Sequence, residues 1–164
     1  MADVHNAQQR QFNMRRIRGK DTKPEMAIRR GLHSLGFRYR LHARALPGRP
    51  DLVFSRYRAV ILVHGCFWHG HQCPLFRLPS TRTEFWQSKI ESNRQRDAKV
   101  HAALLAEGWR VLVVWECSLK GTSKLPLKVL LDTAADFVKG GEAEKIIEGV
   151  FNAPKSVELD IKSE

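Results

Sequence analysis

Hydrophobic and polar positions change their period several times along the chain, and each change predicts a different element. Apolar residues recur at helical spacing from Met26 to Leu35, between a Thr-x-x-Glu start at 22–25 and Gly36. The same spacing returns twice downstream, so we expect three helices, at 22–36, 83–107 and 125–139. Short apolar or alternating runs predict strands at 37–41, 52–54, 59–63 and 109–115.

This order of helices and strands predicts an α/β protein in which helices pack on a central sheet. Two segments that carry proline, 46–50 and 74–82, are expected to be loops. The basic stretch 1–20 lacks apolar periodicity and is expected to be an arm. Residues 21–140 would form the folded domain, and 141–164, where charges are scattered, a flexible tail.

Length and composition are those of one globular domain. The chain has 164 residues, of which 43% are hydrophobic, so it can bury a sizeable core. No run reaches the roughly 18 apolar residues of a membrane helix. The polar start shows no secretory signal, and although its basic residues fit a transit peptide, Asp3 and the lack of serine weigh against one. A bacterial cytoplasmic location and no membrane partner are therefore expected.

The charge balance changes the expected partner. Lys and Arg number 28 against 17 Asp and Glu, a formal net charge of +11. Such an excess favours a polyanion, because each phosphate contact releases counterions. Nucleic acid is the expected partner, and a generally basic protein is the alternative. The basic segment that holds Met14 and Arg15 could lie on a phosphate backbone as a short helix or an arm.

The chain has three cysteines: Cys66, Cys73 and Cys117. An odd number does not suit a disulfide framework, and a reducing compartment favours metal binding. With one histidine from the same segment, the thiolates would complete a tetrahedral zinc site. His69 and His71 both fit the spacing, so either is the fourth ligand, and unmetallated thiols are the alternative. Four protein ligands leave no position for water, so this zinc would be structural.

A second candidate site lies where two predicted strands meet. Asp51 opens one strand and Val63 ends the next, so both can lie at one edge of the sheet. A carboxylate with waters and phosphate holds Mg²⁺, and the backbone carbonyl of Val63 can add a ligand. Otherwise Asp51 only caps the preceding turn. His64 and His69 follow closely, and a histidine can deprotonate an attacking water near neutral pH.

Large aromatic residues lie in and near the same segment: Phe67, Trp68 and Trp86. In a basic protein they can stack on bases or wedge between base steps, or they can pack in the core. One face of the predicted long helix carries Trp86, Lys89, Asn93 and Asp97. This face could contact a phosphate and place Asp97 against a histidine to fix its tautomer, or it could be a solvated surface.

Several long blocks together resemble one family. They are Leu-Pro-Gly-Arg-Pro-Asp at 46–51, His-Gly-Cys-Phe-Trp-His at 64–69, Thr-Arg-Thr-Glu-Phe-Trp at 81–86 and the run 108–117, with 1–5 and 13–16 similar too. Over about residues 1–120 the chain resembles the very-short-patch repair (Vsr) mismatch endonucleases. The resemblance implies a restriction-endonuclease-like fold, with a central mixed sheet flanked by helices and a structural zinc site.

The resemblance also implies an activity: a Mg²⁺-dependent nick in double-stranded DNA, 5′ to the thymine of a T·G mismatch left by deamination of 5-methylcytosine. Asp51 and the Val63 carbonyl would hold Mg²⁺. His69 would be the general base or acid, oriented by Asp97. His64 and Glu25 would lie in the same site.

The resemblance assigns further residues. Zinc would be held by Cys66, His71, Cys73 and Cys117. Phe67, Trp68 and Trp86 would intercalate beside the mismatch, and the segment around Met14 would clamp the opposite groove. A monomer acting on nucleoid DNA, and a MutL-type mismatch-repair partner, are expected.

Two departures accompany the resemblance. Val63 stands where the family has threonine, a change that a backbone ligand tolerates, and the chain after about residue 122 matches no family block. Two other functions compete with mismatch nicking: a restriction-type endonuclease on unmismatched duplex, and a zinc-stabilised DNA-binding module without catalysis.

Overall fold

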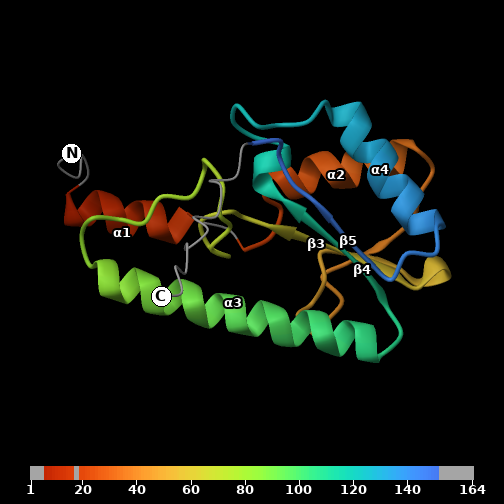
Figure 1. Ribbon diagram of the computed structural model, residues 1–164, viewed down its shortest axis with the longest axis horizontal. Coiled ribbons are helices and arrows are strands. Elements are labelled where there is room, and N and C mark those ends of the chain that lie inside the picture. Colours follow the sequence, from red (N-terminus) through yellow and green to blue (C-terminus); the bar gives the residue numbers. More distant parts are fainter. Residues whose placement is uncertain (1–5, 17–18, 152–164) are drawn as a thin grey trace, which may run out of the picture.

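The structure is a computed structural model that describes residues 6–16 and 19–151. A five-stranded sheet lies at its centre with helices on both faces (Figure 1). In spatial order the strands are β1 (Arg40–Leu41), β2 (Leu52–Phe54), β3 (Ala59–His64), β4 (Arg110–Trp115) and β5 (Glu144–Ile147). The first three pair antiparallel, whereas β3, β4 and β5 pair parallel. The predicted mixed α/β sheet is therefore confirmed.

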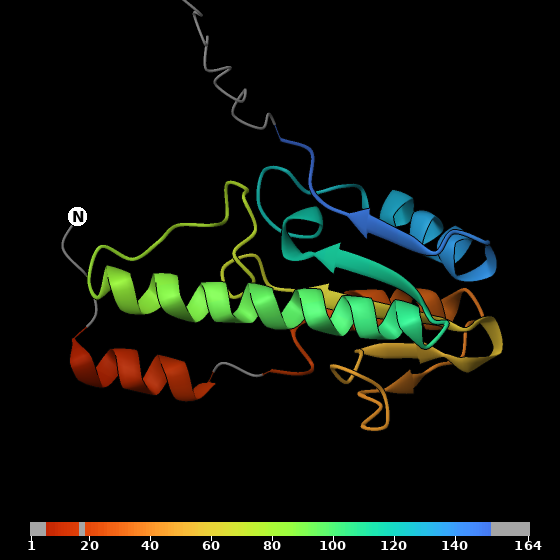
Figure 2. The same cartoon turned by 60° about the horizontal axis from the view of Figure 1, so that its bottom comes forward.

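Helices cover the two faces unequally. Helices α2 (Lys23–Ser34) and α4 (Leu127–Lys139) pack on one face, and the long α3 (Thr83–Ala106) crosses the other (Figure 2). Helix α1 (Ala7–Arg16) lies beside the first half of α3. Two short 3₁₀ turns, η1 (Ser55–Tyr57) and η2 (Glu116–Ser118), follow β2 and β4.

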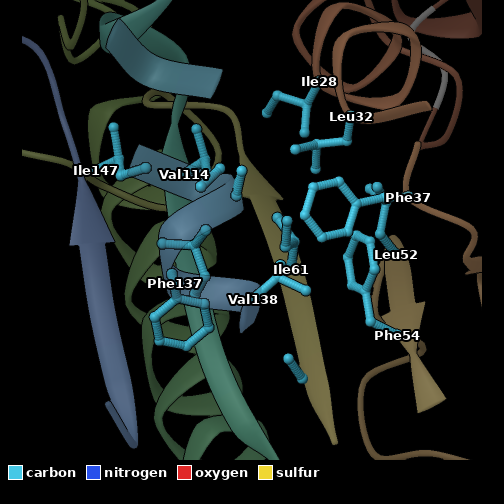
Figure 3. Close-up of a cluster of buried hydrophobic side chains, with 14 of the residues drawn as sticks. Ile28, Leu32, Phe37, Leu52, Phe54, Ile61, Val114, Phe137, Val138 and Ile147 are labelled. Carbon is cyan, nitrogen blue, oxygen red and sulfur yellow. The ribbon is translucent and has the colours of Figure 1, made fainter. Parts of the chain in front are cut away.

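The core has two layers because successive side chains of a strand point to opposite faces. From β3 and β4, Ile61 and Val114 pack with Ile28 of α2 on one face (Figure 3). Their neighbours Leu62 and Val113 join the layer under α3. Both faces are buried, which explains the unbroken apolar runs of these strands.

Local signals place α2 against the sheet. The Thr22 hydroxyl accepts a hydrogen bond from the backbone N–H of Glu25 at 3.4 Å, as an N-cap should. The Glu25 carboxylate accepts instead from the N–H of Asp21, at 2.9 Å, and is only 2% exposed. At Gly31 a Cβ atom would lie 2.4 Å from the Leu131 side chain, so this glycine lets α2 and α4 approach closely.

The C-terminal region differs from its predicted tail. Glu144–Ile147 form the edge strand β5, parallel to β4, so the prediction of a flexible tail from residue 141 is wrong for this segment. Only Ile147 is buried, at 4% exposure, whereas Ile146 is 61% exposed. A short edge strand with one buried side chain leaves no clear periodicity in the sequence. The strand predicted at 37–41 is also shorter, because only Arg40–Leu41 pair with β2.

Among the described residues, no helix is long and apolar enough to cross a membrane.

Candidate active site and metal cluster

The tips of β2 and β3 meet at Asp51, which directly precedes β2. Its Oδ2 accepts a 2.7 Å hydrogen bond from the backbone N–H of Val63. The N–H and C=O of one strand residue point to the same side, so the Val63 carbonyl opens toward the edge that holds Asp51. The predicted meeting of the two strand ends is therefore present.

The loop before β2 is fixed on the opposite helix. Gly48 has a φ of +70°, and a Cβ there would lie 2.3 Å from the Val100 side chain of α3. Because only glycine fits this close approach, the segment 46–50 is pressed onto α3. The packing sets where Asp51 enters the sheet.

Burial raises the pKa of Asp51 to about 6, and the nearby Glu25 carboxylate adds to the rise. The Val63 hydrogen bond and the imidazoles of His42 and His69 act in the opposite direction. The carboxylate is thus desolvated beside another acid. A cation bound there would remove the cost of its charge.

His69 and Asp97 form the second half of the site. His69 lies in the loop that follows β3, and its Nδ1 is 2.5 Å from Oδ2 of Asp97 on α3. A carboxylate at this nitrogen fixes the tautomer with the proton on Nδ1, which leaves Nε2 able to accept one. The predicted pairing of Asp97 with a histidine is therefore present, and the histidine is His69.

His64 lies flat against His69. The two rings stack with centroids 3.9 Å apart and planes 3° apart, and Trp115 meets His64 edge-on at 5.1 Å. Burial and, to a smaller extent, the neighbouring His69 lower the pKa of His64 to about 3, so the ring stays neutral. His64 is suited to supporting the His69 ring rather than to carrying charge.

Glu25 reaches this site through a residue that sequence reasoning missed. Nε2 of His42 is 3.0 Å from Oε1 of Glu25, and its Nδ1 is 3.7 Å from Oδ1 of Asp51. His42 stands outside the histidine-rich segment and outside every predicted element, so no sequence signal indicated it. The structure thus brings Glu25, His64, His69 and Asp51 to one place, as predicted, and adds His42.

A cavity of about 560 Å³ has His42, Asp51, Val63, His64, His69 and Asp97 on its wall. Four cationic side chains share the wall: Lys20, Arg44, Arg49 and Arg96. Cations around a carboxylate and an imidazole suit a phosphate group that must be bound and attacked.

The aromatic residues form a cluster beside this cavity. Phe67 is 5.2 Å from Trp68 and 5.5 Å from Trp86 between ring centroids, and all three are half-buried. Each ring is therefore packed against its aromatic neighbours and partly exposed to solvent. Phe67 and Trp68 line a neighbouring cavity of about 740 Å³ that also reaches His69 and Asp97.

The helix face predicted from spacing takes two roles. Lys89 is exposed, and both Lys89 and Asn93 line the aromatic cavity. The Asn93 amide also donates a 2.9 Å hydrogen bond to the Trp68 carbonyl, so it holds the aromatic loop against α3. Arg15 lies exposed on α1, whereas the Met14 side chain falls outside the described residues.

The cysteines gather at the ends of β3 and β4. His64 of β3 pairs with Trp115 of β4. Continuing that register by two residues sets Cys66 beside Cys117, whose N–H donates to the Cys66 sulfur at 3.3 Å. The sheet therefore brings together two thiols that are far apart in sequence, and burial raises the pKa of both.

His71 and Cys73 complete the cluster. Nδ1 of His71 lies 3.7 Å from the Cys66 sulfur and 3.6 Å from the Cys117 sulfur, and all four ligand atoms lie within 4.8 Å of one another. Zn–S and Zn–N bonds of about 2.3 and 2.0 Å imply an S···N edge of roughly 3.5 Å in a tetrahedron. The residues fit a zinc ion, and His71 rather than His69 is the histidine among them.

The end of β5 supports this cluster. Nε2 of His71 is 2.7 Å from Oε2 of Glu148, and the N–H of Gly149 donates to the Cys117 sulfur at 3.3 Å. A carboxylate on the remote nitrogen is the usual way to orient a metal-binding histidine. Glu148 gave no sequence signal, because it lies in the predicted tail.

A carboxylate, an imidazole–carboxylate pair and surrounding cations at the strand tips of a mixed sheet define a phosphodiester-cleaving nuclease. Residues 2–75 match the family model of the DNA mismatch endonuclease Vsr. The chain is 45% identical over 148 residues to the DNA mismatch endonuclease Vsr of Escherichia coli, covering 90% of this chain and 95% of that protein. It is 50% identical over 134 residues to the type II nicking enzyme V.XorIIP of Xanthomonas oryzae pv. oryzae, covering 80% and 98%.

The chain therefore belongs to the Vsr family of DNA mismatch endonucleases. It is a hydrolase that nicks DNA, and the family resemblance of its sequence blocks is confirmed.

Proposed function

We propose that this endonuclease nicks one DNA strand 5′ to the thymine of a T·G mismatch, and so begins very-short-patch repair of deaminated 5-methylcytosine. The observation that carries the proposal is the convergence of Asp51, Val63 and the His69–Asp97 pair on one cation-lined cavity. The names of two relatives, a mismatch endonuclease and a nicking enzyme, support it.

Asp51 and the carbonyl of Val63 would hold Mg²⁺ at this cavity. The desolvated carboxylate of Asp51 and a carbonyl on the same strand edge are the oxygen ligands that Mg²⁺ accepts. When bound, the ion would neutralise charge on the phosphate and make water a better nucleophile.

His69 would move the proton. With Asp97 on Nδ1, its free Nε2 can take a proton from the attacking water or give one to the leaving oxygen. His64 keeps the ring in place by stacking on it without adding charge. The four cations on the wall, Lys20, Arg44, Arg49 and Arg96, suit the scissile phosphate and its neighbours.

Mismatch selection would come from the aromatic cluster. Phe67, Trp68 and Trp86 stand beside the catalytic cavity, where they can enter the base stack. Unstacking costs a few kcal/mol and is cheapest at a poorly stacked mismatch. Lys89 would contact the backbone beside them, and the N-terminal segment with Met14 and Arg15 would clamp the opposite groove.

Zinc would be held by Cys66, His71, Cys73 and Cys117 as a structural ion, since four protein ligands leave no position for water. It would fasten the aromatic loop to the ends of β4 and β5. Action as a monomer on nucleoid DNA in the bacterial cytoplasm, with a MutL-type partner, stays a prediction.

The test is a nicking assay on matched duplexes that differ at one pair, T·G, T·A or C·G, each with and without added Mg²⁺. We expect cutting only of the T·G duplex and only with Mg²⁺. Equal cutting of all three would favour a restriction-type endonuclease. Mg²⁺-dependent nicking that survives Asp51→Ala would contradict the proposed active site, whereas binding without any nicking would indicate a DNA-binding module.

A further inference from the structure

Glu25, His42 and Asp51 form a chain of side chains from the buried start of α2 to the proposed metal ligand. Oε1 of Glu25 faces Nε2 of His42 at 3.0 Å, and Nδ1 of the same ring faces Oδ1 of Asp51 at 3.7 Å. Oδ2 of Asp51 is already fixed by the Val63 N–H at 2.7 Å. His42 is therefore placed to restrain the other carboxylate oxygen.

The backbone at His42 is built for this placement. His42 has a φ of +47°, in the left-handed region, which histidine, asparagine and aspartate adopt more often than other residues with a side chain. Its N–H donates to the Asp51 carbonyl at 3.3 Å, so both the backbone and the side chain of His42 face Asp51.

Glu25, the buried member of this series of side chains, is held in place by several contacts. Glu25 is 2% exposed, its Oε2 accepts from the Asp21 N–H at 2.9 Å, and its Oε1 lies 3.5 Å from Arg29. Nε2 of His42 is itself shielded from solvent and has no hydrogen bond of good angle, although Oε1 of Glu25 is within reach.

The acids near His42 do not form a second cation site. Arg29 contacts Asp21 at 2.6 Å and also Glu25, so a cation already serves both carboxylates. The His42 imidazole therefore lies between two carboxylates. That of Glu25 is buried and held in place, and that of Asp51 lines the active cavity.

We propose that His42 is a positioning residue that transmits the fixed position of Glu25 to the carboxylate of Asp51 and so pre-organises the metal ligand. The proposal rests on the proposed function only in taking Asp51 as a metal ligand. It gives Glu25, which is too buried to meet the substrate, a role through His42. Loss of such an outer-shell partner typically weakens metal binding by about 10–100-fold.

Three variants distinguish the contact of the His42 ring with Asp51 from its contact with Glu25. His42→Ala removes both links. His42→Asn keeps a polar atom near the position of Nδ1, facing Asp51, and tolerates the positive φ. His42→Gln keeps one near Nε2, facing Glu25. The control is His33→Ala, which removes an exposed histidine from α2.

The readouts are Mn²⁺ affinity of the protein alone by titration calorimetry, and nicking rate as a function of Mg²⁺ concentration. We expect His42→Ala to weaken Mn²⁺ binding and raise the half-saturating Mg²⁺ concentration about 10-fold or more. The rate at saturating Mg²⁺ should stay within about threefold of the parent, because the ion, once bound, holds Asp51 itself. His42→Asn should recover most of the affinity and His42→Gln less.

Unchanged Mn²⁺ affinity in His42→Ala would overturn the proposal. So would a His42→Gln protein that binds like the parent while His42→Asn binds like His42→Ala, because the contact with Asp51 would then be dispensable. A parent protein that binds Mn²⁺ through Asp51 but does not nick a T·G duplex would refute the proposed function alone. If Asp51→Asn binds Mn²⁺ as tightly as the parent, the metal site itself is misplaced.

Discussion

The backbone N–H of Val63 donates a 2.7 Å hydrogen bond to Oδ2 of Asp51, and this bond joins the tips of two antiparallel strands. This hydrogen bond does not fully offset the effect of burial on the pKa of Asp51, which is still raised to about 6. Between its ordinary value and about 6, the folded protein therefore binds more protons than the unfolded chain. Stability contributed by Asp51 is gained as the pH falls through about 6, and above that the charged carboxylate destabilises the fold.

Asp51→Asn should therefore abolish nicking while making the protein more stable. The amide oxygen can still accept from Val63, and the buried charge is gone. At pH 8 and without added Mg²⁺ we expect the free energy of unfolding to rise by about 1–3 kcal/mol, measured by urea denaturation. The gain should vanish near pH 4, where Asp51 is neutral in the parent, and a variant less stable than the parent at pH 8 would contradict this account.

The Mg²⁺ requirement should depend on pH for the same reason. Below a pH of about 6 a proton competes with the ion for Asp51, so the half-saturating Mg²⁺ concentration should rise about tenfold per pH unit. Above that pH it should level off. The measurement is a Mg²⁺ titration of nicking between pH 5 and 8, in which the maximal rate and the half-saturating concentration are fitted separately. A half-saturating concentration that is constant across this range would show that Asp51 does not compete with protons for the ion.

Asp97→Asn should slow nicking by about 10²–10⁴-fold without unfolding the protein. An amide cannot hold His69 with its proton on Nδ1 as a carboxylate does, so Nε2 would often carry the proton and could not act as a base. The measurement is the single-turnover nicking rate at saturating Mg²⁺. Asp132→Asn, on the exposed face of α4 where it pairs with Lys128, is the matched control. A parent-like rate in the Asp97 variant would remove His69 from the proposed chemistry.

Removing zinc should loosen β5 as well as the aromatic loop. We expect about one zinc per parent chain by elemental analysis and none in Cys117→Ser. Glu148→Gln should still bind zinc but lose it to a chelator about 10–100-fold more readily, since Glu148 orients His71. Glu142→Gln, which changes an exposed acid near the start of β5, serves as the control. Equal zinc content in the parent and in Cys117→Ser would refute the ligand assignment.

The parts of the fold that sequence could predict are those whose burial leaves a clear period. The runs 59–63 and 109–115 are apolar throughout because both faces of β3 and β4 are covered, and each appears as predicted. Strand β5 was missed because it lies at the sheet edge, with Ile146 in solvent and only Ile147 buried. Its place is decided by backbone pairing to β4 and by contacts with the cysteine cluster, neither of which is written in local periodicity.

The site shows the same division. Asp51 and Val63 were predictable because one hairpin brings their strand ends together, and the cysteines because few residues bind zinc. Spacing could not choose between His69 and His71, since the choice depends on the turn between them and on Asp97, which lies on α3. No sequence pattern indicated His42 or Glu148, because each acts on a residue that is distant in sequence.

The pairing of His64 with Trp115 has a consequence for folding. The facing segments of β3 and β4 are so uniformly apolar that a slip by two residues, which keeps each side chain on its own face, would still bury hydrophobic side chains on both layers. Cys66 and Cys117 become neighbours only in the native alignment. An ion bound by both sulfurs would stabilise the native alignment over slipped ones. It would thus help to select the correct strand register during folding, independently of DNA binding.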